Sequence, residues 1–405
     1  GIPVEWRDAI RDGILEWNKA FVAIGLQNVI QVKQLPDIIP ADAKDMPLDT
    51  ADARFNIVRW VTDDALDNAH AVAHARFNPL NGQVLSGSIN ITSSFVRITQ
   101  LEKMLSVDPA AAFLRVAESV PFADMLGSSK ESLQCRLAEH GRTNAWLGLQ
   151  AMEGGANRGP LSNREYVRQF LREAIAHETG HLLGLRHNFA ASSQYTLGQL
   201  GNSTFVNTKG TSASVMDYTP FNIMAIEDKD VPFFSPVIGP YDYWAIQYGY
   251  MDTKGIKDPA DEVAILNQVA RKSGQLGYRY QGDEAADSFD PTVTRFDLSS
   301  DPLAYWTKSL EMSEKLLAAL PGRLPKYGRS YVEFTRSFGM IVNQIGQSTA
   351  QVSRFVGAQT VNRSFKGDVN APAPLRPVPA STQKKAIATL HDYLFGTFAL
   401  PIPAS

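Results

Sequence analysis

Cysteine is almost absent from the sequence: Cys135 is the single one among 405 residues. One thiol cannot form an internal disulfide, so a fold stapled by disulfides is excluded. No apolar run approaches the ~18 residues that a membrane-spanning helix needs, and we expect no transmembrane segment in this chain. The formal net charge of −3 offers no general attraction to nucleic acid, so we expect no nucleic-acid partner.

Histidine is also scarce, which makes its placement informative. The chain has seven histidines, and residues 177–187 hold three of them in the run His-Glu-Thr-Gly-His-Leu-Leu-Gly-Leu-Arg-His. This run fills every specified position of the H-E-x-x-H-x-x-G-x-x-H pattern. At this histidine content the pattern arises by chance in roughly one such chain in 100,000. It therefore strongly indicates a catalytic zinc site.

The spacing has a mechanical reason. On a helix, His177 and His181 lie one turn apart, about 6 Å along one face, so both imidazoles reach one metal ion. Glu178 lies ~100° further round, near a metal-bound water without being a ligand. Gly184 permits a positive φ and a sharp turn, after which His187 returns as the third ligand. Three neutral imidazoles leave a fourth position for water, as in catalytic zinc sites.

A second pattern follows at residues 214–218, Ser-Val-Met-Asp-Tyr. Here the sequence resembles the metzincins, a clan of zinc endopeptidases in which a methionine-containing turn passes beneath the metal. The resemblance implies that Met216 forms the hydrophobic floor of the site. It also implies that Tyr218 stands near the metal as a fifth ligand or as a hydrogen-bond donor to the transition state. Residues 239–250 are similar to the helix that closes many metzincin domains.

The resemblance covers roughly residues 1–250, and the long remainder is similar to the large bacterial Met-zincin group. The expected fold is α+β: a metzincin-like catalytic domain over 1–250 and a mainly helical region over 251–405. The catalytic domain would contain a mixed sheet with an antiparallel edge strand, the metal helix and the Met-turn. Residues 95–160 are expected to form a helical insertion, because compact metzincins lack so long a stretch there.

Periodicity predicts the individual elements. Apolar residues at three- and four-residue spacing predict a helix over 4–22, and alternation predicts strands at 29–33, 55–60 and 84–91. The metal helix is expected to begin near Ser162. Helices are also expected at 302–320, 327–357 and 382–396, with a proline-rich extended segment at 371–379. The strand at 84–91 takes the place of the metzincin edge strand, so Ser86 and Gly87 are predicted to hold the substrate backbone.

Together these features predict a zinc-dependent endopeptidase with one Zn²⁺, in which Glu178 is the general base for a metal-bound water. Its partner would be a protein or peptide bound as an extended strand. Two alternatives remain: a catalytically silent metzincin-fold binding module, and a zinc hydrolase of a non-protein amide. We expect a bacterial protein exported to the periplasm, the cell surface or the medium, with its export signal outside this chain.

Other potential ligands are less informative. His70 and His74 lie four residues apart, but no third ligand completes a site. The acidic residues at 283–301 suggest calcium binding, yet they lack the alternating ligands and the glycine of a calcium loop, so a solvated or helix-capping role is favoured. Cys135 lacks the Pro-Arg-Cys-Gly setting of the cysteine that keeps some metzincins latent, which indicates a buried, inert thiol.

Overall fold

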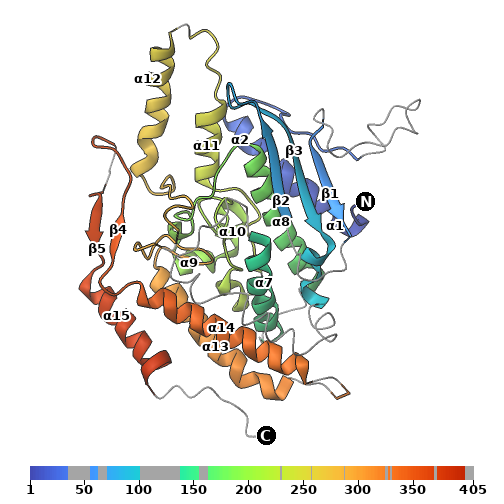
Figure 1. The fold of residues 1–405 in the computed structure, drawn as a ribbon, viewed down its shortest axis with the longest axis vertical. Helices are drawn as coiled ribbons and strands as arrows, with labels where there is room; N and C mark the ends of the chain where they lie inside the picture. The colour runs from blue at the N-terminus through green and yellow to red at the C-terminus, as the bar shows by residue number, and fades with distance from the viewer. Residues whose placement is uncertain are drawn as a thin grey trace.

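The computed structural model describes the chain between residues 1 and 396, with gaps. The described residues are 1–34, 55–62, 71–100, 137–154, 163–228, 230–256, 258–286, 288–323, 327–328, 331–368 and 372–396. Helices form the bulk of this part of the chain, and two small sheets accompany them (Figure 1).

The N-terminal segment forms two short helices, α1 (Val4–Leu15) and α2 (Asn18–Ala23). The helix predicted over 4–22 is therefore confirmed, with a turn at residues 16–17 dividing it. Its regularly spaced apolar side chains are buried, as expected for the core-facing side of an amphipathic helix. These include Trp6, Ile10, Ile14, Trp17 and Phe21.

The strand predicted at residues 29–33 is wrong, because these residues belong to no strand. A side chain satisfies the backbone there in place of a neighbouring strand. Ile30 N donates to Asn18 Oδ1 (2.9 Å), and Asn18 Nδ2 donates to Ile30 O (2.8 Å). Alternation along the sequence indicates which side chains face the core, but it does not guarantee a partner strand.

Three strands form a mixed sheet with the order β1-β3-β2. They are β1 (Ile57–Val61), β2 (Ala71–Phe77) and β3 (Val84–Thr92). β1 pairs with β3 in parallel, and β2 pairs with β3 antiparallel. A tight turn joins β2 to β3, and its Gly82 has a φ of +74°. The predicted mixed sheet with an antiparallel edge strand is thus confirmed.

The identity of the edge strand is a correction. β3 is the central strand of the described sheet, and β1 and β2 are its outer strands, so the prediction that 84–91 forms the exposed edge is wrong. Ser86 is buried and faces Arg76 of β2. Gly87 N already donates to Asn56 Oδ1 (2.8 Å). The described part of β3 is paired on both sides, so it offers no open backbone edge, and the substrate role of Ser86 and Gly87 stays a prediction.

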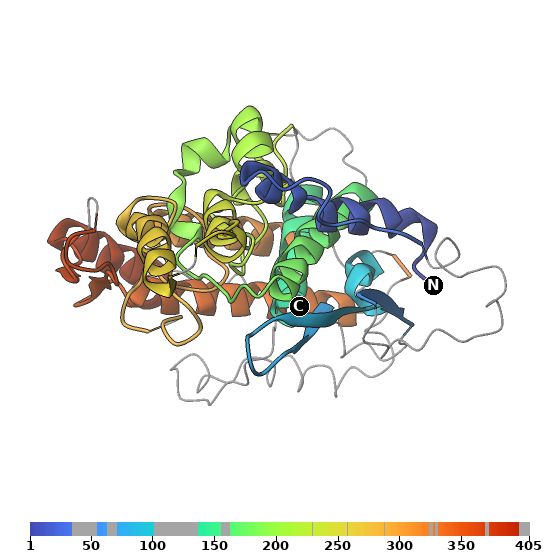
Figure 2. The same ribbon diagram turned by 90° about the horizontal axis from the view of Figure 1, so that it is seen from above.

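The predicted metal helix is α8 (Asn163–Leu182), which runs between α1 and the sheet (Figure 2). Its expected core-facing side chains are buried. They are Val167, Phe170, Leu171, Ala174 and Ile175. Ser162, the predicted N-cap, lies outside the described residues. The two-sided packing of α8 fixes the helix in place between the N-terminal helices and β2.

The stretch at 95–160 is described only at its ends. A 3₁₀ helix, η2 (Ser93–Gln100), follows β3, and α7 (Leu137–Gly154) precedes the metal helix. α7 is buried over residues 144–152, and the Tyr166 hydroxyl of α8 donates to Ala145 O (2.8 Å). The described part of α7 therefore belongs to the core.

After α8 the chain consists mainly of loops with short helices. These are η3 (Ser192–Gln194), α9 (Leu197–Leu200), α10 (Ser203–Lys209), η4 (Ile223–Ile226) and α11 (Pro240–Tyr250). Side-chain caps start α9 and α10: Gln199 N donates to Thr196 Oγ1 and Phe205 N donates to Asn202 Oδ1. The helix expected within 239–250 is confirmed as α11, which packs against α2.

The C-terminal region is mainly helical, as predicted. Its elements are α12 (Pro259–Ala270), η5 (Arg271–Gly274), α13 (Pro302–Arg323), α14 (Val332–Ser353), β4 (Gln359–Val361), β5 (Leu375–Pro377), α15 (Ala380–Leu390) and η6 (His391–Phe395). α13 and α14 pack along each other across the base of the fold (Figure 1). One cluster of buried apolar side chains runs from Trp6 to Leu390.

None of the described helices has the length and apolar character that crossing a membrane requires.

Candidate metal centre

α8 presents the first two histidines and the glutamate of the pattern. His177 and Glu178 have no exposed surface, and His181 is partly buried. The ring centroids of His177 and His181 lie 4.7 Å apart, as one helical turn dictates. Just before them, the Trp17 indole donates to Ala176 O (2.8 Å). The N-terminal helices thereby hold α8 in place at the residue preceding the first histidine.

The turn at Gly184 brings the third histidine back to the helix. Gly184 has a φ of +86°, and Leu185 N donates to Gly180 O (3.0 Å) to close the helix end. The His187 ring centroid lies 4.7 Å from that of His181 and 5.3 Å from that of His177. The structure therefore brings together the three histidines that the sequence pattern singled out.

Each of the three imidazoles has one ring nitrogen engaged by an acceptor. His177 Nδ1 lies 2.6 Å from Val215 O, and His181 Nδ1 lies 2.9 Å from Leu185 O. His187 Nδ1 lies 2.7 Å from Asp283 Oδ1. Carbonyl and carboxylate oxygens only accept, so each Nδ1 must donate. Each Nε2 then keeps its lone pair, which is the atom that a metal ion binds.

The converging Nε2 atoms fit a cation. The potential ligand atoms of the triad all lie within 4.8 Å of one another, and His181 Nε2 lies 3.1 Å from His187 Nε2. Two lone pairs at this distance repel each other unless a positive charge lies between them. A Zn²⁺ ion binds imidazole nitrogens at about 2.0–2.1 Å, which suits this spacing. Three histidines without a carboxylate or thiolate are a known catalytic zinc set.

The surroundings of His177 and His181 favour the neutral imidazole. Burial lowers the pKa of His177 well below its usual value, and the neighbouring His181 and His187 rings lower it further. Burial also lowers the pKa of His181 to about 4, again assisted by His187. Neutral imidazole is the form that binds a metal ion.

The side chain of Glu178 extends from α8 to the three-stranded sheet. Its Oε2 accepts a hydrogen bond from Ala73 N of β2 at 2.7 Å. Ala73 faces Ile89 in the β2–β3 ladder, and this N–H points away from β3 towards α8. The carboxylate is therefore fixed beside the outer strand of the sheet.

The Met-turn packs under the metal helix at Gly180. Met216 is fully buried, and a Cβ atom at position 180 would lie 2.2 Å from its sulfur. Gly180, an unspecified position of the sequence pattern, thus permits the close approach of the turn. Met216 O also accepts from Asn188 N (3.0 Å). Met216 therefore packs close to α8 at Gly180, one residue before His181, and its role as the floor of the metal site stays a prediction.

Asp242 of α11 anchors this turn, a role that the sequence did not reveal. Its carboxylate is fully buried and accepts from Ser214 Oγ (2.5 Å), Val215 N (3.0 Å) and Gly239 N (2.8 Å). Burial raises the pKa of Asp242 to about 7. Because Val215 O accepts from His177, Asp242 supports a metal-facing side chain through the turn. The similarity of residues 239–250 to the metzincin helix was the available signal.

A second buried carboxyl ties α8 to the segment after the turn. Glu173, one turn before His177, accepts hydrogen bonds from Thr219 Oγ1 and Ser235 N. Burial raises the pKa of Glu173 to about 7, although both hydrogen bonds oppose the rise.

Tyr218 lies beside two of the histidines. Its ring centroid is 4.8 Å from that of His187 and 5.6 Å from that of His177. The side chain is 3% exposed and also packs on Phe189 and Phe296. The position suits either role that the resemblance suggested, and it equally suits packing.

Several acidic residues at 283–301 connect the C-terminal region to this site through hydrogen bonds. Asp283 contacts His187, Asp290 accepts from Arg279 Nη2 (2.8 Å), and Asp297 accepts from Ser192 Oγ (2.7 Å). Asp301 caps α13 through Ala304 N (3.1 Å). The helix-capping role predicted for the cluster holds for Asp301, while Asp283 and Asp297 contact His187 and the loop that follows it.

The remaining expectations fall largely outside the described residues. His70 and Cys135 both lie there, and His74 stands on the exposed face of β2. Within the described ranges, the triad of His177, His181 and His187 is the one cluster of three or more potential metal ligands.

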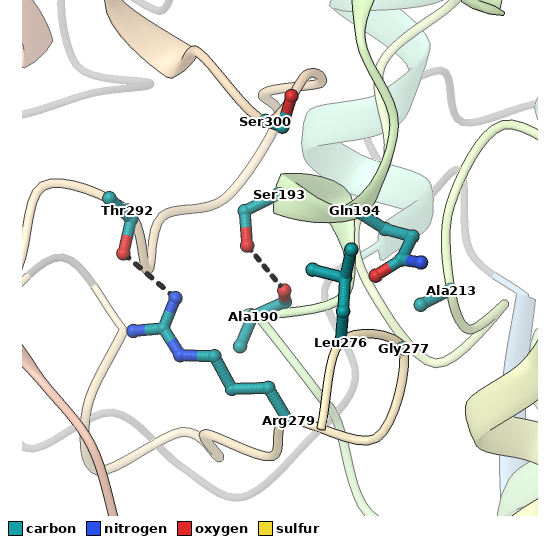
Figure 3. Close-up of a pocket in the computed structure, with 9 residues that line it drawn as sticks. All are labelled: Ala190, Ser193, Gln194, Ala213, Leu276, Gly277, Arg279, Thr292 and Ser300. Carbon is teal, nitrogen blue, oxygen red and sulfur yellow. Dashed lines mark hydrogen bonds between the residues drawn. The ribbon is translucent and has the colours of Figure 1, made fainter. Parts of the chain in front are cut away.

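A cavity lies beside the loop that follows His187, and none of the three histidines lines it (Figure 3). It is lined by Ala190, Ser193, Gln194, Ala213, Leu276, Gly277, Arg279, Thr292 and Ser300. Its one charged side chain is already engaged, since Arg279 donates to Thr292 Oγ1 (2.9 Å) and Asp290 Oδ2 (2.8 Å). None of the histidines lines this cavity, so we assign it no part in the chemistry.

A family model described as Met-zincin matches residues 160–404, which is more than half of the chain. The match contains the metal helix, the Met-turn and the C-terminal helices, and it begins after the sheet. No curated protein and no solved structure matches the chain.

Proposed function

The chain belongs to the Met-zincin family, and on that premise we propose that it is a zinc-dependent endopeptidase. His177, His181 and His187 would hold one catalytic ion, and Glu178 would act as general base. The observation that carries the proposal is the orientation of the imidazoles: each Nδ1 meets an acceptor, so three Nε2 lone pairs converge next to a buried carboxylate.

The chain's own residues divide the chemistry between them. A zinc ion, when bound, acts as a Lewis acid that polarises a peptide carbonyl and activates water. Glu178 accepts the proton of the attacking water and delivers it to the leaving nitrogen. The hydrogen bond from Ala73 N holds the carboxylate in place for both transfers. Met216 and Asp242 support the histidines from below and take no part in the proton transfer.

We place the substrate on β2. This strand is one of the two outer strands of the described three-stranded sheet, it runs antiparallel to β3, and its Ala73 N donates to Glu178. Because Ala73 N already donates to Glu178, an extended protein or peptide segment would pair with the residues of β2 on either side of Ala73 and would pass the carboxylate directly. Backbone pairing of this kind supplies affinity with little dependence on side chains.

A cleavage profile against a peptide library tests the proposal. The purified chain is expected to cut internal peptide bonds, to lose this activity in a zinc chelator and to regain it when zinc is restored. Release of terminal residues alone would contradict an endopeptidase. Zinc binding without cleavage of any peptide would favour the silent binding module or the hydrolase of a non-protein amide.

Tyr218→Phe tests the role of the phenol near the metal. We expect kcat to fall about 10²-fold, with zinc content unchanged and KM nearly constant, because the hydroxyl would donate to the oxyanion in the transition state. Steady-state kinetics and metal analysis measure the two effects. An unchanged kcat would leave Tyr218 as a packing residue between His187 and Phe189.

A further inference from the structure

The third histidine is the one whose orientation depends on the C-terminal region. The geometry points to Asp283 as a positioning residue for His187, held in place by the segment 279–284. This inference rests on the proposed zinc site. It assigns part of the metal centre to residues far outside the sequence pattern at 177–187.

The three histidines are held in different ways. His177 and His181 stand on a helix, and their Nδ1 atoms meet the backbone carbonyls of Val215 and Leu185. His187 stands on a loop, so no helix fixes its backbone. Its ring is held by a carboxylate instead, with Nδ1 2.7 Å from Asp283 Oδ1. The imidazole side chain is 6% exposed and the Asp283 side chain is 29% exposed, so the contact is shielded from water mainly on the histidine side.

Three hydrogen bonds set the position of the segment before Asp283 relative to His187. Phe189 N donates to Gln281 O (2.8 Å), and Gln281 N donates to Asn188 Oδ1 (3.1 Å). Asn188 Nδ2 donates to Arg279 O (3.0 Å). These three bonds pair the residues directly after His187 with residues 279–281. Asp283 follows two residues later, which brings its side chain against the ring.

Neighbouring charges surround the same loop. Arg186 Nη2 lies 3.1 Å from Glu284 Oε2 and 3.5 Å from Asp283 Oδ2, and Arg363 Nη1 lies 3.0 Å from Glu284 Oε1. These ion pairs are exposed, so each contributes little to stability. Glu284 has no contact with a histidine among these pairs. It therefore offers a matched control for the carboxylate next to it.

The expected consequence is a stronger and better oriented nitrogen donor. A carboxylate on Nδ1–H fixes the tautomer with the lone pair on Nε2, and it holds the ring plane towards the ion. A charge-assisted hydrogen bond does this more strongly than a carbonyl does. Loss of such a partner commonly weakens metal affinity by about 10- to 100-fold.

The test uses the full chain with Asp283→Ala, Asp283→Asn and the control Glu284→Gln. Zinc affinity is measured by competition with a chelator, the visible spectrum is recorded after Co²⁺ substitution, and thermal unfolding is followed without metal. We expect Asp283→Ala to raise the zinc Kd about 10- to 100-fold. Asp283→Asn still accepts from Nδ1 without the charge, so its loss should be smaller. Glu284→Gln should stay within about twofold of the parent.

The metal-free chain separates positioning from folding. Positioning predicts an altered Co²⁺ spectrum in Asp283→Ala while the metal-free unfolding temperature of Asp283→Asn stays close to that of the parent. Equal zinc affinity in the parent and in both Asp283 variants would overturn the inference and leave the proposed function intact. An equal loss in Glu284→Gln would also overturn it, as a general effect of loop charge. A parent chain that binds no zinc would overturn the proposed function itself.

Discussion

Replacing Glu178 by glutamine is expected to lower kcat for peptide cleavage by at least about 10²-fold while zinc content and fold persist. The amide matches the carboxylate in shape but cannot accept the proton of the attacking water. Glu178 is fully buried and directly follows His177 in the chain. Steady-state kinetics on a cleaved peptide, together with metal analysis, measure the effect.

Glu165→Gln is the matched control for this substitution. Glu165 begins the same helix and pairs with Arg168 at the surface (2.6 Å), far along α8 from the histidines. The Glu165→Gln variant should cleave the peptide at the parental rate. If Glu178→Gln also cleaves at the parental rate, Glu178 is not the general base and the proposed mechanism fails.

Removing the anchor of the Met-turn should cause the largest loss of stability. Asp242→Ala leaves three buried donors unsatisfied, on Ser214, Val215 and Gly239. Each such donor costs about 1–3 kcal/mol, so we expect the free energy of unfolding to fall by about 3 kcal/mol or more. Burial raises the pKa of Asp242 to about 7. A neutral asparagine at this position should therefore cost less than alanine.

Denaturant unfolding of the metal-free chain measures this effect, with Asp252→Ala as its control. Asp252 is exposed and accepts from Lys254 N (2.8 Å) in a turn after α11. Its substitution should change the free energy of unfolding by about 0.5 kcal/mol or less. An Asp242→Ala chain as stable as that control would show that the turn does not depend on this carboxylate.

The residues of the proposed centre were predictable because their spacing is local. Helix geometry alone aligns His177 with His181, and a glycine with positive φ is enough to return His187. The amphipathic periodicity of α1, α8, α13 and α14 likewise reflects one-sided burial along a helix. For such features, the residues that determine the structure lie within a few helical turns of one another in the sequence.

The partners of the site were not predictable because they are distant in sequence. Asp283 lies 96 residues from His187, and Asp242 lies 28 residues from Ser214. Acidic residues at such separations give no periodic signal, so Asp283 looked like part of a solvated cluster. The predicted edge position of residues 84–91 was wrong for a similar reason. Alternation marks a strand, but it does not say whether β2 or β3 pairs on both sides.

Besides the activity and the roles of the site residues, two further sequence-based expectations stay predictions. One is the division into a catalytic part over 1–250 and a C-terminal part over 251–405. The contact between His187 and Asp283 crosses that boundary, so the two parts would have to fold together to complete the site. The other is export of the chain by a bacterium, which localisation of the tagged protein in the source cell would test.

Zinc content is the most direct test of the central claim. The full chain, purified without chelators, should contain one zinc per molecule, and His181→Ala should contain almost none, since two imidazoles alone do not make a catalytic zinc site. Metal analysis of both proteins against the measured protein concentration gives the answer. A parent chain without stoichiometric zinc, or a His181→Ala chain that keeps it, would contradict the claim that these three histidines form the metal centre.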